Sequence, residues 1–173
     1  FENGKIFPIP EERVLIAEDE SRIDFHWRSL LFLDAPGHAR HHYCVIDEST
    51  NSLFTGDNFG ISYREFENEN GTFIFLTTTP VQFDPEVMWK TLDLLLNYKL
   101  QAAYLTHFGR VTNVEKLGWD LRNYLNQLVE MALDLKQKGK AQQDNLEAGV
   151  KRNIHWISRN AIYNPLFMLW RWC

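Results

Sequence analysis

Three short motifs, each directly after an apolar run, constrain the fold of this chain more than any other feature. Each motif places a side chain that can bind metal within two residues of a glycine: His38 after Leu30–Leu33, Asp57 after Leu53-Phe54, and His107 after the run 102–105. Short apolar runs bounded by turn residues are typical of buried strands. Strand ends that meet at one edge of a sheet bring such side chains together, so the pattern predicts an α/β fold with one shared site.

Helices are predicted between and after these motifs. Asp84 is a suitable N-cap, Pro85 suits the first helical position, and apolar residues then recur at intervals of three and four to about Asn97. A longer helix is predicted from Asn113 to about Lys138 and a weaker one over 142–156. Strands are predicted over 14–17, 23–27, 30–33, 42–46 and 101–106, with 72–76 either a strand or an extended connection.

Each candidate residue also has an ordinary structural interpretation. A histidine at a strand end is commonly a surface or hydrogen-bonded residue, and Gly56-Asp57 is a common turn. Together, two histidines and one aspartate form a nitrogen and oxygen ligand set for a metal. His26, expected in a strand beside Trp27, and His155, expected in a helix, are interpreted as structural. The charges of Glu65, Glu67 and Glu69 are interpreted as a solvated loop.

The motifs also occur in a family-specific order. Ala35-Pro36-Gly37-His38, Leu53-Phe54-Thr55-Gly56-Asp57 and Leu105-Thr106-His107-Phe108-Gly109 resemble the third, fourth and fifth metal motifs of the metallo-β-lactamase superfamily. The resemblance implies part of an αββα sandwich, with residues 1–112 as the C-terminal half of that domain and 113–173 as a helical extension. It also implies that His38 binds a first metal, that Asp57 bridges both metals and takes part in catalysis, and that His107 binds the second. Zinc is the expected metal for both positions, although iron or manganese suits the same ligands.

The first metal motif of that family, a His-x-His-x-Asp-His run, is absent from these 173 residues, and we expect it upstream of Phe1. With fewer than three protein ligands per metal, this chain alone is expected to bind metal weakly or not at all and to turn over no substrate. An apolar face of the sheet is expected to be exposed, which favours self-association, with a homodimer as one form.

The residues after Gly37 depart from the pattern of glyoxalase II-type members. Those hydrolases usually continue Pro-Gly-His with a small pair and a glycine before the next histidine, whereas this sequence has Ala39-Arg40-His41-His42. A glutathione thioester is therefore disfavoured as the substrate. Arg40 and His41 either contact an anionic substrate or are solvated polar residues. His42 matches a histidine that generally supports the site without binding metal directly.

Composition narrows the classes of partner. The formal net charge of -5 argues against a nucleic-acid-binding surface and favours a small-molecule substrate. Only Cys44 and Cys173 are present, too few for a disulfide scaffold, which favours a cytoplasmic location. No apolar run is long enough to span a membrane, so no membrane association is expected.

The activity implied by the resemblance is hydrolysis, in which water activated at a dinuclear metal site attacks an ester, a thioester or a similar bond. Two alternatives stay open. One is a redox enzyme on the same fold that uses a single iron, of the persulfide dioxygenase type. The other is a non-catalytic structural or interaction fragment, which would bind metal without turnover or bind none.

Overall fold

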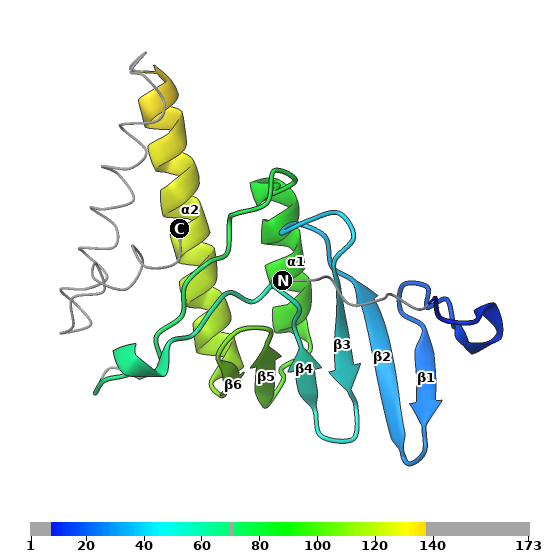
Figure 1. The fold of residues 1–173 in the computed structure, drawn as a ribbon. Helices are drawn as coiled ribbons and strands as arrows, with labels where there is room; N and C mark the ends of the chain where they lie inside the picture. Colours follow the sequence, from blue (N-terminus) through cyan, green and yellow to red (C-terminus); the bar gives the residue numbers. More distant parts are fainter. Residues whose placement is uncertain (1–7, 70, 138–173) are drawn as a thin grey trace, which may run out of the picture.

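The computed structural model describes residues 8–69 and 71–137. Within this range a six-stranded sheet is covered on one face by two helices (Figure 1). The strands are β1 (Arg22–Phe25), β2 (Arg28–Asp34), β3 (Tyr43–Asp47), β4 (Ser52–Phe54), β5 (Ala102–Leu105) and β6 (Gly109–Val111); the helices are α1 (Pro85–Asn97) and α2 (Val114–Gln137), with short 3-10 turns η1 (Glu11–Arg13) and η2 (Arg64–Phe66). The weak helix predicted over 142–156, His155 and Cys173 lie outside the described residues.

The strands lie in the sheet in the order β1-β2-β3-β4-β5-β6. Every neighbouring pair is antiparallel except β4 and β5, which are parallel. Parallel neighbours need a crossover connection, and α1 lies in the segment that joins β4 to β5. The α/β fold class predicted from the sequence is therefore confirmed. β6 was not predicted, because Gly109–Val111 has only one apolar side chain and leaves no signal of a strand in the sequence.

Both strongly predicted helices are confirmed. The side chain of Asp84 caps α1 by accepting hydrogen bonds from the backbone N–H groups of Glu86 and Val87, at 3.0 and 3.1 Å. Pro85 occupies the first turn, where its missing N–H leaves no hydrogen bond unmade. In the described part of the chain, neither helix combines the length and the hydropathy that a membrane span requires.

One hydrophobic core joins the sheet to both helices. Each buried leucine in it contributes roughly 1.5–3 kcal/mol to stability by leaving water. The core residues alternate along the strands on one face of the sheet and recur every three or four positions along the helices; they include Leu31, Leu33, Ile46, Leu53 and Leu105 from the sheet, Met88, Leu92 and Leu95 from α1, and Leu117, Leu121 and Leu125 from α2. The start of α2 thus packs in the same core as the sheet, while the boundary at 112/113 stays a prediction.

The opposite face of the sheet is open and carries aromatic side chains. Phe32, Val45, Phe54 and Tyr104 pair in register across four strands and share this face. The rings of Phe54 and Tyr104 stack with centroids 5.1 Å apart, and 43% and 38% of these residues is exposed. The exposed apolar sheet face expected from the sequence is therefore found among the described residues.

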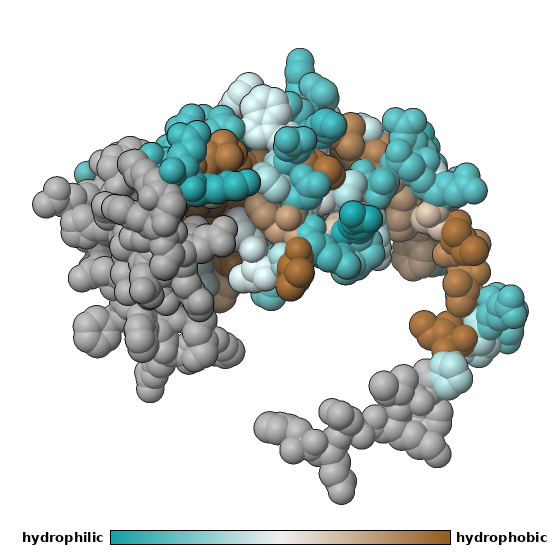
Figure 2. Space-filling model, turned by 90° about the horizontal axis from the view of Figure 1, so that it is seen from above, coloured by the Kyte–Doolittle hydropathy of each residue, from teal (hydrophilic) through white to brown (hydrophobic). Residues whose placement is uncertain are grey.

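Some predictions for the N-terminal part were wrong. Residues 14–17 form no strand, and Val14, Leu15 and Ile16 are 53%, 78% and 89% exposed. Figure 2 shows apolar residues of this segment standing away from the body of the protein. An apolar run becomes a strand only where it pairs with another strand, and this run pairs with none of the described strands, although β1 is an edge strand of the sheet.

Two further details differ from or refine the predictions. His26 lies in the turn between β1 and β2 with a φ of 57°, and not in a strand, and it is exposed. The segment 72–76 is an extended connection, joined to the preceding loop by a single bridge between Ile61 and Phe75. The loop that holds Glu65, Glu67 and Glu69 leaves all three exposed, as predicted.

Candidate metal centre

The three sequence motifs meet at one edge of the sheet. β2, β4 and β5 run in the same direction, so the turns that follow them lie at the same edge. The backbone N–H of Thr55 donates to the carbonyl oxygen of Tyr104 at 3.1 Å, which continues the pairing of β4 and β5 up to the two turns. This arrangement brings His38, Asp57 and His107 together although they are far apart in the sequence.

Asp57 lies at the centre of a cluster of histidines. Its Oδ2 atom lies 3.7 Å from Nε2 of His38 and 3.9 Å from Nε2 of His42, while Oδ1 lies 3.5 Å from Nε2 of His107. The side chain of His38 is 7% exposed and that of His107 is 53% exposed. The cluster therefore has a buried side at His38 and an open side at His107, and the two oxygens of Asp57 face different histidines.

Thr77 holds both His38 and Asp57 in place. Nδ1 of His38 lies 3.2 Å from the carbonyl oxygen of Thr77, and the Thr77 hydroxyl donates to the backbone carbonyl of Asp57 at 2.6 Å. A carbonyl oxygen only accepts hydrogen bonds, so this contact requires the proton of a neutral His38 ring on Nδ1. Nε2 then has its lone pair available on the side of Asp57, as in histidines that bind metal.

The turn that presents His38 requires a glycine at position 37. Gly37 has a φ of +136°, and a Cβ at this position would lie 2.5 Å from Cα of Met88 in α1. Its carbonyl oxygen accepts a hydrogen bond from the backbone N–H of Asp84, the N-cap of the same helix, at 2.9 Å. The start of α1 thus packs directly against the turn and fixes the position of His38.

Asn58, the residue after Asp57, connects two of the motif turns. Its amide donates to the carbonyl oxygen of Ala35 at 2.7 Å and lies 3.7 Å from Sγ of Cys44. The side chain of Asn58 is fully buried, and its Oδ1 atom has no hydrogen-bond partner within the described residues. A buried amide that links the turns restricts their relative movement.

The pKa of His42 is lowered from its ordinary value. Burial is the largest cause, and repulsion from His38 adds to it, while attraction by Asp57 offsets only part of the effect. The ring of His42 is therefore mainly neutral at pH 7. Neutral imidazole is the form that binds metals, and the structure places it as a neighbour of Asp57.

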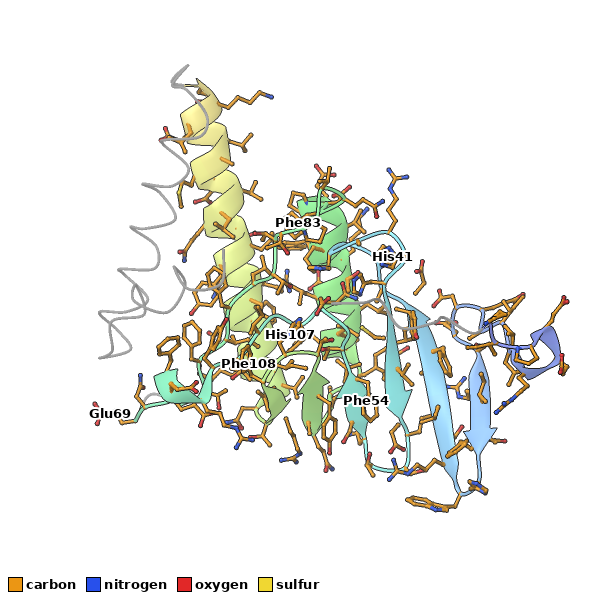
Figure 3. The ribbon with its side chains drawn as sticks, in the orientation of Figure 1. His41, Phe54, Glu69, Phe83, His107 and Phe108 are labelled. Carbon is orange, nitrogen blue, oxygen red and sulfur yellow. The ribbon has the colours of Figure 1, made fainter. Side chains whose placement is uncertain are left out.

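Arg40 and His41 lie at the rim of the site and are both exposed. The backbone N–H of Arg40 donates to the side chain of Gln82 at 3.4 Å, and His41 stacks on His42 with ring centroids 5.1 Å apart. His41 comes from the loop between β2 and β3, whereas His107 follows β5 (Figure 3). Thr77 and Asn58 were not singled out from the sequence. Only the position of Asn58 next to Asp57 could have indicated its role.

The donor set fits a metal ion. His38, His42 and Asp57 each offer one ligand atom, and these atoms all lie within 4.8 Å of one another. Imidazole nitrogen and carboxylate oxygen are the ligands that zinc, iron and manganese accept in proteins. His107 faces the second oxygen of Asp57, on the other side of the carboxylate.

The chain is similar to known proteins over more than half of its length. A family model described as the metallo-beta-lactamase superfamily matches residues 2–107, more than half of the chain. The metallo-beta-lactamase fold-containing protein ST1585 of Sulfurisphaera tokodaii is 27% identical over 104 residues. The crystal structure of ST1585 from Sulfolobus tokodaii is similar with a TM-score of 0.54 and 25% identity. The sec-alkylsulfatase Pisa1 from Pseudomonas sp., with a TM-score of 0.53 at 19% identity, is similar in fold.

These matches cover only part of each relative. The sequence match to ST1585 includes 60% of this chain and 36% of that protein, and the structural match includes 73% and 44%. The match to Pisa1 includes 74% of this chain and 20% of that one. The chain therefore spans less than half the length of the relatives it matches.

Proposed function

Because the chain belongs to the metallo-β-lactamase superfamily, we propose that it supplies metal ligands and part of the active site of a metal-dependent hydrolase. The proposed ligands are His38, Asp57 and His107. The observation that carries the proposal is the position of Asp57, whose two carboxylate oxygens face His38 and His107 at 3.7 and 3.5 Å. A carboxylate with histidines on both sides would be able to help hold more than one cation.

The ligand types favour zinc, with iron or manganese as alternatives that metal analysis distinguishes. A site with two ions and three protein ligands for each ion needs more ligands than the three proposed residues. The proposed site therefore requires further ligands. We therefore expect the 173-residue chain by itself to bind metal weakly and to lack turnover. A small-molecule substrate and a cytoplasmic location remain part of the proposal.

Bound metal supplies polarisation of the bond to be cleaved and lowers the pKa of water. The residues of this chain hold the proposed metal ligands in position. Thr77 keeps Nε2 of His38 directed at the site, and the buried Asn58 keeps the turns together. The net reaction is hydrolysis: the water oxygen bonds to the acyl carbon, the bond to the leaving alcohol or thiol breaks, and that group leaves with one proton of the water.

Arg40 and His41 suit contact with a negatively charged part of the substrate. Both side chains are exposed at the rim, and His41 is held against His42 by ring stacking. A guanidinium group binds carboxylate or phosphate oxygens through two parallel hydrogen bonds. This assignment predicts that Arg40→Ala weakens the binding of anionic substrates more than of neutral ones.

Metal content measured by plasma mass spectrometry tests the proposal directly. It should be measured on the 173-residue chain and on the longest natural form of the protein, each after loading with zinc and desalting. We expect up to two equivalents in the longest form, with loss on His38→Ala or Asp57→Ala. His26→Ala is the matched control, because His26 is an exposed histidine in a turn away from the site.

Turnover is tested in parallel on a panel of simple esters, thioesters and phosphoesters, with and without a chelator. Hydrolysis that the chelator abolishes and zinc restores would support the proposal. Protein that retains no metal and hydrolyses none of the panel would contradict it and leave the non-catalytic interpretation. One equivalent of iron, together with oxygen consumption, would contradict the hydrolase proposal and favour a redox enzyme.

A further inference from the structure

An aromatic residue stands in an unfavourable backbone conformation directly beside the proposed metal ligands. Phe108 follows His107 and has a φ of 72°, which bulky side chains rarely adopt. The ring centroids of His107 and Phe108 are 6.4 Å apart, and 51% of Phe108 is exposed (Figure 3). The hydrophobic core does not explain this conformation, because Phe108 is not part of it.

A row of aromatic rings supports Phe108 from the loop that follows Asp57. Tyr63 packs against Phe108 with ring centroids 4.3 Å apart, and the row continues through Phe66 to Phe73 at 5.6 and 5.2 Å. η2 lies within this loop, contains Phe66 and begins directly after Tyr63. Phe108 is therefore held in place rather than free to turn into solvent.

Strained residues persist where the surrounding structure enforces them, and they are concentrated at functional sites. An exposed ring beside a metal site, held by a second ring, offers apolar contact to whatever binds at the metal. We infer that Phe108 and Tyr63, here called the aromatic rim, bind the apolar acyl group of the substrate. The inference rests on the proposed hydrolase function and adds a substrate class to it, namely esters or thioesters of medium-length or aryl carboxylic acids.

The aromatic rim lies on the open side of the cluster, next to the half-exposed His107. Arg40 and His41 come from a different loop, between β2 and β3, and His41 adjoins His42. The loops that follow Asp57 and His107 thus contribute aromatic side chains to the site, and the loop between β2 and β3 contributes basic ones. An acyl chain at the aromatic rim would leave the basic residues for a polar or anionic leaving group.

The test compares a short and a longer acyl chain in the longest natural form of the protein, loaded with metal. The value of kcat/KM is measured for p-nitrophenyl hexanoate and p-nitrophenyl acetate, and their ratio is the readout. We expect a ratio on the order of ten or more in the wild-type protein, because the additional methylene groups leave water against the aromatic rim. Phe108→Gly should reduce the ratio to about two, by removal of this contact.

Two features of the variants keep the result interpretable. Phe108→Gly removes the ring and is compatible with a positive φ, so this substitution should not unfold the turn. Phe54→Ala removes a comparably exposed ring on the open face of the sheet and should leave the ratio unchanged. Circular dichroism spectra of both variants should match that of the wild type.

Binding supplies a readout that does not depend on turnover. The dissociation constants of hexanoate and acetate, the products of the two esters, are measured by calorimetry on the same variants. We expect hexanoate to bind more tightly than acetate to the wild type, with a difference that Phe108→Gly abolishes and Phe54→Ala preserves. A wild-type protein without preference in either assay, or a preference that survives Phe108→Gly, would overturn the inference. Loss of metal and of all turnover would instead contradict the proposed function, and the binding data would then decide on the aromatic rim.

Discussion

Nδ1 of His38 lies 3.2 Å from the carbonyl oxygen of Thr77, a residue whose hydroxyl donates to the backbone of Asp57. One threonine thus positions two of the proposed metal ligands. Thr77→Val keeps the shape of the side chain and removes the hydroxyl. In the longest natural form of the protein, we expect zinc affinity to fall by about tenfold, because groups that orient metal ligands commonly contribute this much. Competition with a fluorescent chelator measures the change, and Thr79→Val, in the exposed part of the same segment, should show none.

Gly37→Ala should destabilise the protein and displace His38. The substitution places a Cβ 2.5 Å from the backbone of Met88 at a φ of +136°. Gly71→Ala is the matched control, since Gly71 also has a positive φ, of +110°, but no atom lies within 4 Å of the added Cβ. Both variants are destabilised by an alanine at a positive φ. Gly37→Ala should lose about 1–3 kcal/mol more in free energy of unfolding because of the clash. Urea denaturation measures both, and equal losses would show that the close contact with α1 is unimportant.

The two adjacent histidines of the β2–β3 loop should behave differently. His42 offers a ligand atom near His38 and Asp57, whereas His41 is exposed and only stacks on His42. In the longest natural form of the protein, we expect His42→Ala to weaken zinc binding by about 10- to 100-fold and His41→Ala to leave it within about twofold of the wild type. Isothermal calorimetry distinguishes these values. An equal loss in both variants would mean that the loop conformation, and not the His42 ring, matters.

Cys44 should be unreactive in the folded protein. Burial raises the pKa of its thiol from 9.0 to about 12, and the residue is 0% exposed. In a Cys173→Ser variant, which leaves Cys44 as the single cysteine, a thiol reagent at pH 8 should react at least about a hundredfold more slowly than in denaturant. Since the unfolded thiol ionises at a lower pH than the folded one, stability should also fall as the pH rises above 9.0. A fast native reaction would show that the core around Cys44 opens readily.

The open face of the sheet should cause self-association. Phe54 and Tyr104 stack there and are both exposed. We expect Tyr104→Lys to shift the 173-residue chain toward the monomer in sedimentation velocity experiments, because a charge on an apolar face opposes its burial. Val81→Lys adds the same charge at a fully exposed valine outside the sheet and should leave the distribution unchanged.

Features that depend on residues close together in the sequence were predictable. Asp84 and Pro85 lie beside each other and together define the start of α1, which the structure confirms. The meeting of His38, Asp57 and His107 was also predictable, because each ends an apolar run and the order of motifs resembles one family. Their roles as ligands stay a prediction that metal analysis must test.

The missed features depend on contacts between distant segments. Thr77 lies in an irregular stretch without a motif, and its role appears only when the fold places it next to His38. The run Val14–Ile16 has the composition of a strand, but strand formation depends on pairing with another strand, which composition does not encode. Likewise, Phe108 lies between β5 and β6, and its place in a tight connection could not be predicted because β6 was not predicted.

The parallel pairing of β4 and β5 has a consequence for how the site forms during folding. This pair joins segments separated by the whole α1 crossover, and parallel pairing of distant segments is slow because a long loop must close first. In a partly folded chain the antiparallel β2, β3 and β4 already bring Asp57 near His38 and His42, whereas His107 joins them only after the crossover has docked. Metal added before that stage finds an incomplete ligand set, so ions should bind late and then slow the unfolding of the finished protein more than they speed its folding.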